Sequence, residues 1–264
     1  MTDENNVAAE IAKDLAKDVY EDAGHEIMKP TGKLVGLVPR AIRAAIQPME
    51  KWILQREYNI AETEKLLAMK LEKVEPEKIS PPEAYVAVPA LQAISYCMDN
   101  EELRNMYANL LAKSMTDVVR NGVHPGFVEI IKQLCPDEAK VLRHFMKNIT
   151  VPTIGMRCED NNHSGVHVFR MFSDIGEIAN CDCPLNIEQY FCNLIRLGLL
   201  ESSAEGSSLT DKENYAACKI HPYVLSMQHS YTDRLKKFPK VRITEGFVYI
   251  TDFGRAFCRT CIDE

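Results

Sequence analysis

Proline placement sets the strictest limit on how this chain folds. Four prolines fall within residues 75–90, the most proline-dense stretch of the sequence: Pro76, Pro81, Pro82 and Pro89. A proline has no backbone N–H and its ring clashes with the preceding helical turn, so it interrupts a helix. Proline-rich segments are also stiff and extended. We therefore predict a stiff extended connection over 75–90, with a domain or subdomain boundary there.

The region before this connection, residues 1–74, is predicted to be an N-terminal helical arm. Residues 1–26 hold eight acidic residues and two lysines, whereas residues 27–49 hold four basic residues and no acid. Apolar residues recur every four positions in the acidic part, which predicts an amphipathic helix with an acidic polar face. The basic part is predicted to form short helical pieces, because prolines interrupt it.

Two interpretations of this arm remain open. We favour the one in which both segments pack onto the helical body as core and cover, as most amphipathic helices in soluble proteins do. In the other, the acidic helix masks the basic segment, residues 27–54, which on activation binds an anionic membrane surface. The contact residues in that case are Lys33, Leu37, Arg40, Arg43 and Trp52.

Residues 91–148 are predicted to form a helical core. Asp99 is a good N-cap, and two glutamates follow in the first turn, where negative charge favours a helix. Apolar residues then recur at helical spacing for about five turns: Leu103, Met106, Tyr107, Leu110, Leu111, Met115, Val118 and Val119. Two further helices are predicted, one starting near Phe127 and one at Pro136.

Residues 149–264 are predicted to form a winged-helix-like C-terminal domain. Apolar and β-branched residues predict a short strand over 166–172. A helix opened by Pro184 ends in LGLL at 197–200 and passes into a second strand, and a strand over 247–251 and a closing helix over 252–261 follow. The order helix, strand, polar excursion, strand and helix is that of a winged helix-turn-helix, with the 46 residues between Leu200 and Phe247 as an unusually long wing. The predicted fold class is mainly α, α+β overall: a multi-helix body and a C-terminal domain with a few short strands.

Composition and charge exclude several classes of protein. Hydrophobic residues make up 46% and charged residues 26% of the chain, as in a soluble globular protein, and the net charge of −7 disfavours a uniformly basic nucleic-acid binder. Nine irregularly spaced cysteines indicate a reducing compartment rather than a secreted disulfide framework. The N-terminal MTDENNVAAE lacks the features of a signal peptide, and charges interrupt the most apolar segment, residues 27–54. We expect a cytoplasmic protein without a membrane-spanning segment.

Motifs for catalysis are missing apart from one weak pair. The segment around Gly32 lacks most of a phosphate-binding loop, no serine has the flanking glycines of a nucleophile elbow, and His25 lacks the second histidine of a zinc protease motif. Arg120 and His124 resemble the Arg–His pair of helical ribonuclease toxins, which stabilises a phosphate and transfers protons. They are separated by only three residues, and His124 precedes a proline. We favour a helix end with a capping histidine, a protein that is not an enzyme, and no cofactor.

Five candidate zinc ligands fall in one stretch: Cys158, His163, His167, Cys181 and Cys183. Thiolates and imidazoles are the ligands that zinc prefers, and two histidines four residues apart can face one ion. However, the spacing fits no standard zinc finger, and His167 falls in a predicted strand. We therefore favour ordinary buried or surface thiols, with a zinc site as the alternative.

A cluster of five basic residues precedes the last predicted strand: Arg234, Lys236, Lys237, Lys240 and Arg242. On a wing, such a cluster would contact nucleic-acid phosphates. The predicted recognition helix, residues 184–197, carries only Glu188 and Arg196 as charges, with no basic residue near its start. A winged helix that contacts protein is therefore favoured, and we expect a protein partner or self-association, with DNA and RNA disfavoured.

Two stretches of the sequence carry a family resemblance: DNEELRNMYANLL at residues 99–111 and HPGFVEII at residues 124–131. With them the sequence resembles the bacterial abortive-infection alpha family, and the likeness runs from about Lys29 past PDEA at 136–139 to RLGL at 196–199. These motifs consist of caps, turns and core positions, and the family supplies no established catalytic residues. The resemblance implies a role in bacterial defence against phage, in which growth of an infected cell is arrested before phage spread.

The sequence thus favours a bacterial defence protein of abortive-infection type that acts by interaction with protein, and with a membrane on activation, rather than by catalysis. Two alternatives remain: a helical ribonuclease toxin that uses Arg120 and His124, and a winged-helix regulator that binds nucleic acid.

Overall fold

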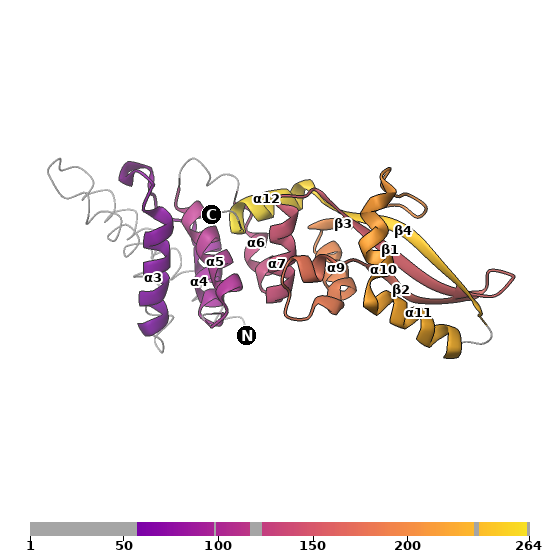
Figure 1. Ribbon diagram of the computed structural model, residues 1–264. Coiled ribbons are helices and arrows are strands. Elements are labelled where there is room, and N and C mark those ends of the chain that lie inside the picture. Colours follow the sequence, from indigo (N-terminus) through magenta and orange to yellow (C-terminus); the bar gives the residue numbers. More distant parts are fainter. Residues whose placement is uncertain (1–56, 98, 117–122, 235–237, 263–264) are drawn as a thin grey trace, which may run out of the picture. The chain divides into compact units, whose positions relative to one another are not determined.

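Helices and one antiparallel sheet make up the parts of the chain that the computed structural model describes, residues 57–97, 99–116, 123–234 and 238–262 (Figure 1). The predicted α+β class is therefore confirmed. The chain divides into two units: the first ends at Gln133 and also contains Arg259–Glu264, and the second comprises Leu134–Cys258.

The described part of the first unit is helical. Its elements are α3 (Glu57–Leu71), the 3-10 helix η2 (Pro76–Lys78), α4 (Ala84–Ile94), α5 (Glu101–Ser114) and α6 (Gly126–Ile131). Helix α5 contacts α3, α4 and α6, so it is the centre of this unit. The apolar stripe predicted for it is buried as expected, with Met106, Tyr107, Leu110 and Leu111 each 2% exposed or less.

The N-cap of α5 lies one residue later than predicted. The side chain of Asn100, not that of Asp99, accepts the hydrogen bond from the N–H of Leu103, at 3.0 Å. Asparagine caps a helix as well as aspartate does, so the sequence did not distinguish the two. The helix ends at Ser114, and the predicted stripe residues Val118 and Val119 lie outside the described residues.

The extended connection expected over 75–90 is helical from Ala84 onward, which corrects the prediction. Pro89 lies inside α4, where a proline costs about 3 kcal/mol or more. The helix nevertheless buries six apolar residues, and each large aliphatic side chain so buried contributes about 1.5–3 kcal/mol. Burial of this apolar face therefore outweighs the proline.

The second unit is built around the sheet. Its strands are β1 (Thr150–Glu159), β2 (Gly165–Phe172), β3 (Leu200–Ser202) and β4 (Lys240–Ile250), in the order β2-β1-β4-β3. Strands β1 and β4 pair along their whole length, from Thr150 opposite Tyr249 to Glu159 opposite Lys240. The sheet therefore contains strands much longer than the short ones expected.

Helices pack against part of this sheet: α9 contacts β2 and β3, α10 contacts β1, and α11 contacts β4 (Figure 1). The helices of this unit are α7 (Pro136–Phe145), α8 (Ile175–Ile178), η4 (Pro184–Asn186), α9 (Ile187–Arg196), η5 (Lys212–Tyr215), α10 (Ala216–Ile220) and α11 (Pro222–Arg234). Helix α12 (Asp252–Cys261) begins in this unit, and its residues from Arg259 onward belong to the first. The predicted starts at Pro136 and Pro184 and the predicted bounds of the closing helix are confirmed.

Helix α9 stops where the sequence predicts, with Gly198 directly after its C-cap Leu197. This glycine has a φ of 73°, a left-handed conformation that glycine adopts without a steric penalty. The N–H of Gly198 donates to the carbonyl of Ile195, and the N–H of Leu199 donates to that of Leu194. These two bonds are the Schellman motif that satisfies the last carbonyls of a helix.

The long wing expected between Leu200 and Phe247 is mostly regular structure, which corrects that prediction. It contains η5, α10, α11 and the first half of β4. Glu245 of β4 makes ion pairs of 2.6 Å with both Lys212 and Lys219, and both lysines lie over the ring of the buried Tyr215. Lys240 and Arg242 alternate with apolar residues, as is typical of a strand. The prediction treated them only as part of a basic cluster and therefore missed this half of β4.

Candidate functional site

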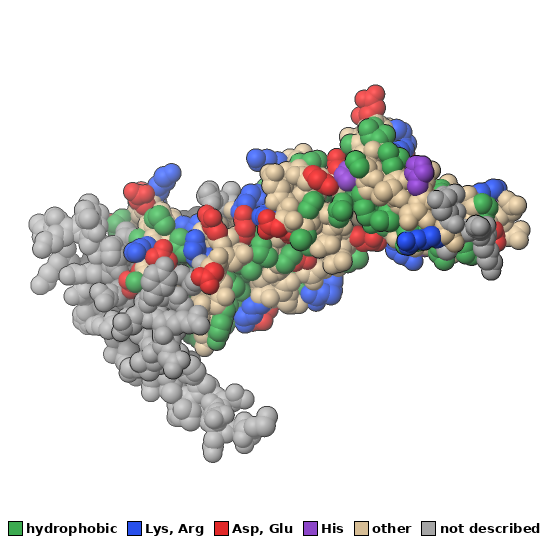
Figure 2. Space-filling model, turned by 60° about the horizontal axis from the view of Figure 1, so that its bottom comes forward, with side chains coloured by type: hydrophobic (Ala, Val, Ile, Leu, Met, Phe, Trp, Pro, Cys, Tyr) green, Lys and Arg blue, Asp and Glu red, His purple; other side chains and the backbone are tan. Residues whose placement is uncertain are grey.

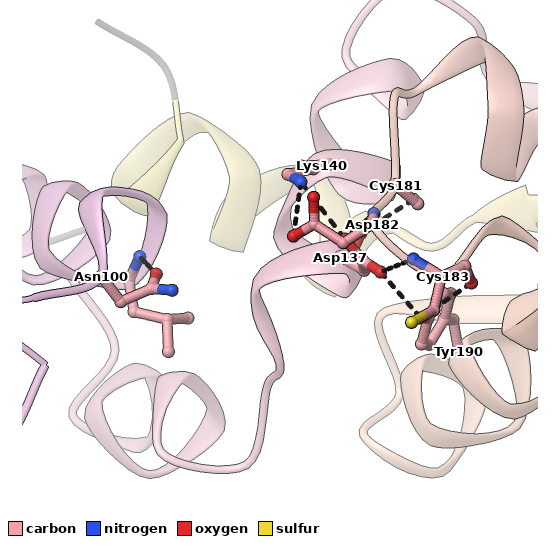
Figure 3. A network of polar contacts seen from close by, with 8 residues as sticks. Asn100, Asp137, Lys140, Cys181, Asp182, Cys183 and Tyr190 are labelled. Atoms are coloured by element: carbon pink, nitrogen blue, oxygen red, sulfur yellow. Dashed lines mark hydrogen bonds and ion pairs between the residues drawn. The ribbon is translucent and has the colours of Figure 1, made fainter.

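The densest polar cluster of the second unit surrounds Asp137 in the first turn of α7 (Figure 3). Its carboxylate accepts hydrogen bonds from the N–H groups of Asp182 and Cys183, at 2.8 and 2.9 Å, and from the hydroxyl of Tyr190 at 2.8 Å. Lys140 lies 3.3 Å from the carboxylate. One buried side chain thus holds together α7, the connection between α8 and η4, and α9.

The protonation of Asp137 fits a structural role. Burial alone would raise the pKa of its carboxyl, but the hydrogen bonds from the two backbone N–H groups, from Tyr190 and from Lys140 outweigh burial and lower it. The neighbouring Glu138 is also buried, and there desolvation prevails and raises the pKa, although its carboxylate accepts a 2.8 Å bond from the N–H of Cys135. Both carboxylates are buried and accept hydrogen bonds from within the fold, which fits a structural role.

An open groove with a volume of about 770 Å³ lies along the exposed side of α9. We call it the α9 groove. Its lining residues are Leu185, Asn186, Glu188, Gln189, Cys192, Asn193, Arg196 and Tyr223. Gln189 and Cys192 are exposed, and the guanidinium of Arg196 is held by two hydrogen bonds, of 3.1 and 2.7 Å, to Oδ1 of Asn193. The groove therefore offers amide groups and one oriented cation.

Apolar side chains are exposed in this groove and elsewhere in the second unit. Leu185 in the groove is 49% exposed, and Ile178 and Ile220 are 56% and 71% exposed. The residues next to these isoleucines, Glu177 and His221, are in contact at 3.1 Å, so α8 and the start of α11 are neighbours. Hydrophobic side chains also gather on the surface around α10 and the first turn of α11 (Figure 2). Contiguous exposed apolar patches mark surfaces that bind other molecules, whereas single exposed residues are common on any protein.

The five candidate zinc ligands are not brought together. The side chain of Cys158 is buried, whereas His167 pairs with Arg157 across β1 and β2 and lies on the opposite face. His163 contacts Glu159 through Nδ1 at 3.1 Å, and the thiol of Cys181 lies 3.7 Å from the carbonyl of Asp137. Burial raises the pKa of Cys181 to about 12. Within the described ranges no three His, Cys, Asp or Glu side chains form a metal-binding group.

The candidate ribonuclease pair is described only in part, because Arg120 lies outside the described residues. His124 Nδ1 accepts a 3.0 Å hydrogen bond from the N–H of Gly126, and its ring contacts that of Phe127. His124 therefore supports the start of α6, as expected of a capping histidine.

The candidate nucleic-acid and membrane contact residues lie only partly within the described residues. Arg234, Lys240 and Arg242 are exposed, whereas Lys236 and Lys237 lie outside the described residues. The candidate membrane contacts also lie outside them: Lys33, Leu37, Arg40, Arg43 and Trp52. No helix in the described ranges combines the length and apolar character needed to cross a bilayer.

Sequence reasoning missed the Asp137 network and the α9 groove. Asp137 follows a proline in the first turn of a helix, where an acid is common for local reasons. Its partners Asp182, Cys183 and Tyr190 are 45 to 53 residues away, so no local pattern marks them. The spacing of the polar residues Asn186, Gln189 and Asn193 on one side of α9 was the available signal for the groove.

Comparisons with known proteins place the chain in a family. The family model for abortive infection alpha matches residues 55–261. No curated protein matches the chain. A solved structure, the uncharacterized protein from the hydrocarbon-degrading marine bacterium Alcanivorax borkumensis SK2, is similar at 19% identity and a TM-score of 0.37, covering 51% of this chain and 90% of that one. The family match spans most of the sequence and includes both stretches that carried the resemblance, so this chain belongs to the abortive infection alpha family.

Proposed function

We propose that this protein acts in an abortive-infection-type response by binding a protein partner through the α9 groove, and not by catalysing a reaction. The observation that carries the proposal is the contrast between the two polar regions of the second unit. The Asp137 network is buried and its hydrogen bonds are used within the fold. The α9 groove presents its amides and an exposed leucine to solvent.

The topology of the second unit supports a binding role for α9. Helix α7 is followed by β1 and β2, then by α8, α9 and β3; β4 comes after η5, α10 and α11 and lies between β1 and β3 in the sheet. We propose that this is a winged-helix core, in which α9 occupies the place of the recognition helix. Glu188 near its start disfavours DNA phosphates, whereas Leu185 and the amides suit a protein surface.

The test uses phage challenge of bacteria that express the protein. The groove variant combines Gln189→Arg with Cys192→Arg, two exposed positions where added length and charge obstruct the groove without disturbing the core. The control variant combines Asn161→Arg with Thr210→Arg, which adds the same charge at exposed sites outside the groove. Plaque counts, host survival and protein level are measured together.

We expect the wild type and the control to reduce plaque counts and the groove variant to lose this effect at equal protein level. Equal protection by all three would refute a role for the groove, and no protection by the wild type would refute the defence role. Sedimentation velocity then identifies the partner class: a dimer that the groove variant abolishes means that a second copy of this chain fills the groove.

A further inference from the structure

Strand pairing places three basic side chains in a row across the sheet of the second unit. Arg157 of β1 lies opposite His167 of β2 on one side and opposite Arg242 of β4 on the other. Directly paired residues point to the same face of a sheet, about 4.8 Å apart from strand to strand. Lys240, two residues before Arg242, lies on that face too. We call Arg157, His167, Lys240 and Arg242 the basic strand face.

This arrangement is unfavourable for the isolated protein. Like charges directly opposite each other in a sheet are destabilising, and Arg157 and Arg242 form such a pair. Glu159 lies on the same face, opposite Lys240, but it is buried; its carboxylate is 3.8 Å from Nε of Arg157, and this Nε has no hydrogen-bond partner. Within the described residues, no carboxylate forms an ion pair with Lys240 or Arg242.

His167 is held neutral among these cations. Its Nε2 lies 3.3 Å from Nη1 of Arg157, which requires that this nitrogen accept the hydrogen bond. Burial lowers the pKa of His167, as do the charges of Arg170 and Arg157, although Glu205 and Glu188 act in the opposite direction. An anion bound on this face would relieve the repulsion between Arg157 and Arg242, and it would raise the pKa of His167.

The cations on the other face of the sheet, unlike Lys240 and Arg242, form ion pairs with a carboxylate. Lys212 and Lys219 both pair with Glu245, which lies at an odd position of β4 and therefore on the face opposite Lys240 and Arg242. The net charge of −7 disfavours a uniformly basic surface, but the exposed Lys240 and Arg242, which form no ion pair within the described residues, make a local basic patch that would attract a polyanion. The face also carries Thr244 and Gly155, and no large exposed apolar residue that would insert into a membrane.

We propose that the basic strand face binds the phosphodiester backbone of a nucleic acid, independently of the α9 groove. The forked guanidinium of the exposed Arg242 matches phosphate geometry, and Lys240 adds a second cation on the same strand. Binding of this kind is insensitive to sequence, because it reads phosphate rather than base edges. The face thus supplies the protein with a ligand site that the basic cluster in the sequence only partly indicated.

The test measures fluorescence anisotropy of a labelled single-stranded RNA and a labelled DNA duplex with the full chain at several salt concentrations. The face variant combines Lys240→Glu with Arg242→Glu. The control variant combines Lys73→Glu with Lys147→Glu, which makes the same change in net charge at exposed sites elsewhere. Anionic phospholipid vesicles form a third arm, and circular dichroism checks that both variants fold.

We expect the wild type and the control to bind at least one nucleic acid at low salt and the face variant to bind on the order of tenfold or more weakly. The dependence of log K on log salt should also become shallower by roughly 1.5 for the face variant, as expected when two phosphate contacts are lost. Absence of nucleic-acid binding by the wild type, equal loss in both variants, or binding to vesicles alone would each overturn the proposal. The plaque test of the α9 groove is unaffected by any of these outcomes.

Discussion

The hydroxyl of Tyr190 in α9 donates a 2.8 Å hydrogen bond to Oδ2 of Asp137 in α7, and the same oxygen accepts the N–H of Cys183. The other carboxylate oxygen accepts the N–H of Asp182. Because a single side chain satisfies three donors from two segments, Asp137 fixes how α7, α9 and the segment between α8 and η4 meet. The orientation of α9, and with it the groove, depends on this contact.

Replacing Asp137 is expected to destabilise the second unit. Asp137→Ala leaves two backbone N–H groups and a tyrosine hydroxyl without their acceptor, and each such loss costs about 1–3 kcal/mol, so we expect a loss of about 3 kcal/mol or more. Asp182→Ala, at a carboxylate that is 79% exposed, should cost less than about 0.5 kcal/mol. Urea unfolding measures the free energy of unfolding of both variants, which can be compared through their midpoints if their m-values are equal. Equal midpoints for both variants would show that the network is not a structural anchor.

Ionisation of Asp137 and ionisation of the adjacent Glu138 should have opposite effects on the free energy of unfolding as the pH changes. Asp137 has a lowered pKa in the fold, so its contribution is present above its ordinary value of 3.8 and is lost as the pH falls below it. Glu138 has a raised pKa, so its ionisation reduces stability as the pH rises above 4.5. The cost of Asp137→Asn should therefore shrink on acidification, whereas Glu138→Gln should gain on the wild type as the pH rises from 4.5. Parallel curves for all three proteins in urea unfolding would contradict this.

Local signals in the sequence predicted several helices correctly, missed others such as α4, α10 and α11, and predicted the sheet poorly. The stripe from Met106 to Leu111, the proline at 136 and the glycine at 198 each act within a few residues, and the structure confirms what they predict. Strand β1 was missed because Pro152 and Gly155 lie within it and it is buried over most of its length, which removes the alternation that marks a strand. The site was missed for a related reason, since its contacts join residues far apart in the sequence.

Two glycines should tolerate alanine to different degrees, for different reasons. Gly198→Ala places a side chain in open space but keeps the left-handed φ of 73°, which costs about 1–2 kcal/mol. A Cβ at Gly254 would lie 2.0 Å from the carbonyl oxygen of Leu199, so the start of α12 would have to move away from the segment after α9. We expect Gly254→Ala to cost about 3 kcal/mol or more. Urea midpoints decide the order, and a smaller loss for Gly254→Ala than for Gly198→Ala would contradict the close packing.

Metal analysis should show no stoichiometric zinc at the five candidate ligands. Cys158 and His167 lie on opposite faces of the hairpin formed by β1 and β2, and His163 is turned toward Glu159. A zinc ion requires about four ligands on one centre, at about 2.0–2.3 Å, which side chains on opposite faces cannot provide. We expect elemental analysis of protein purified without chelator to give well below one zinc per chain, and added EDTA to leave the melting temperature unchanged. One zinc per chain that is lost in both Cys158→Ser and His167→Gln would show instead that these residues converge, and that the pairing of β1 with β2 differs from the one described.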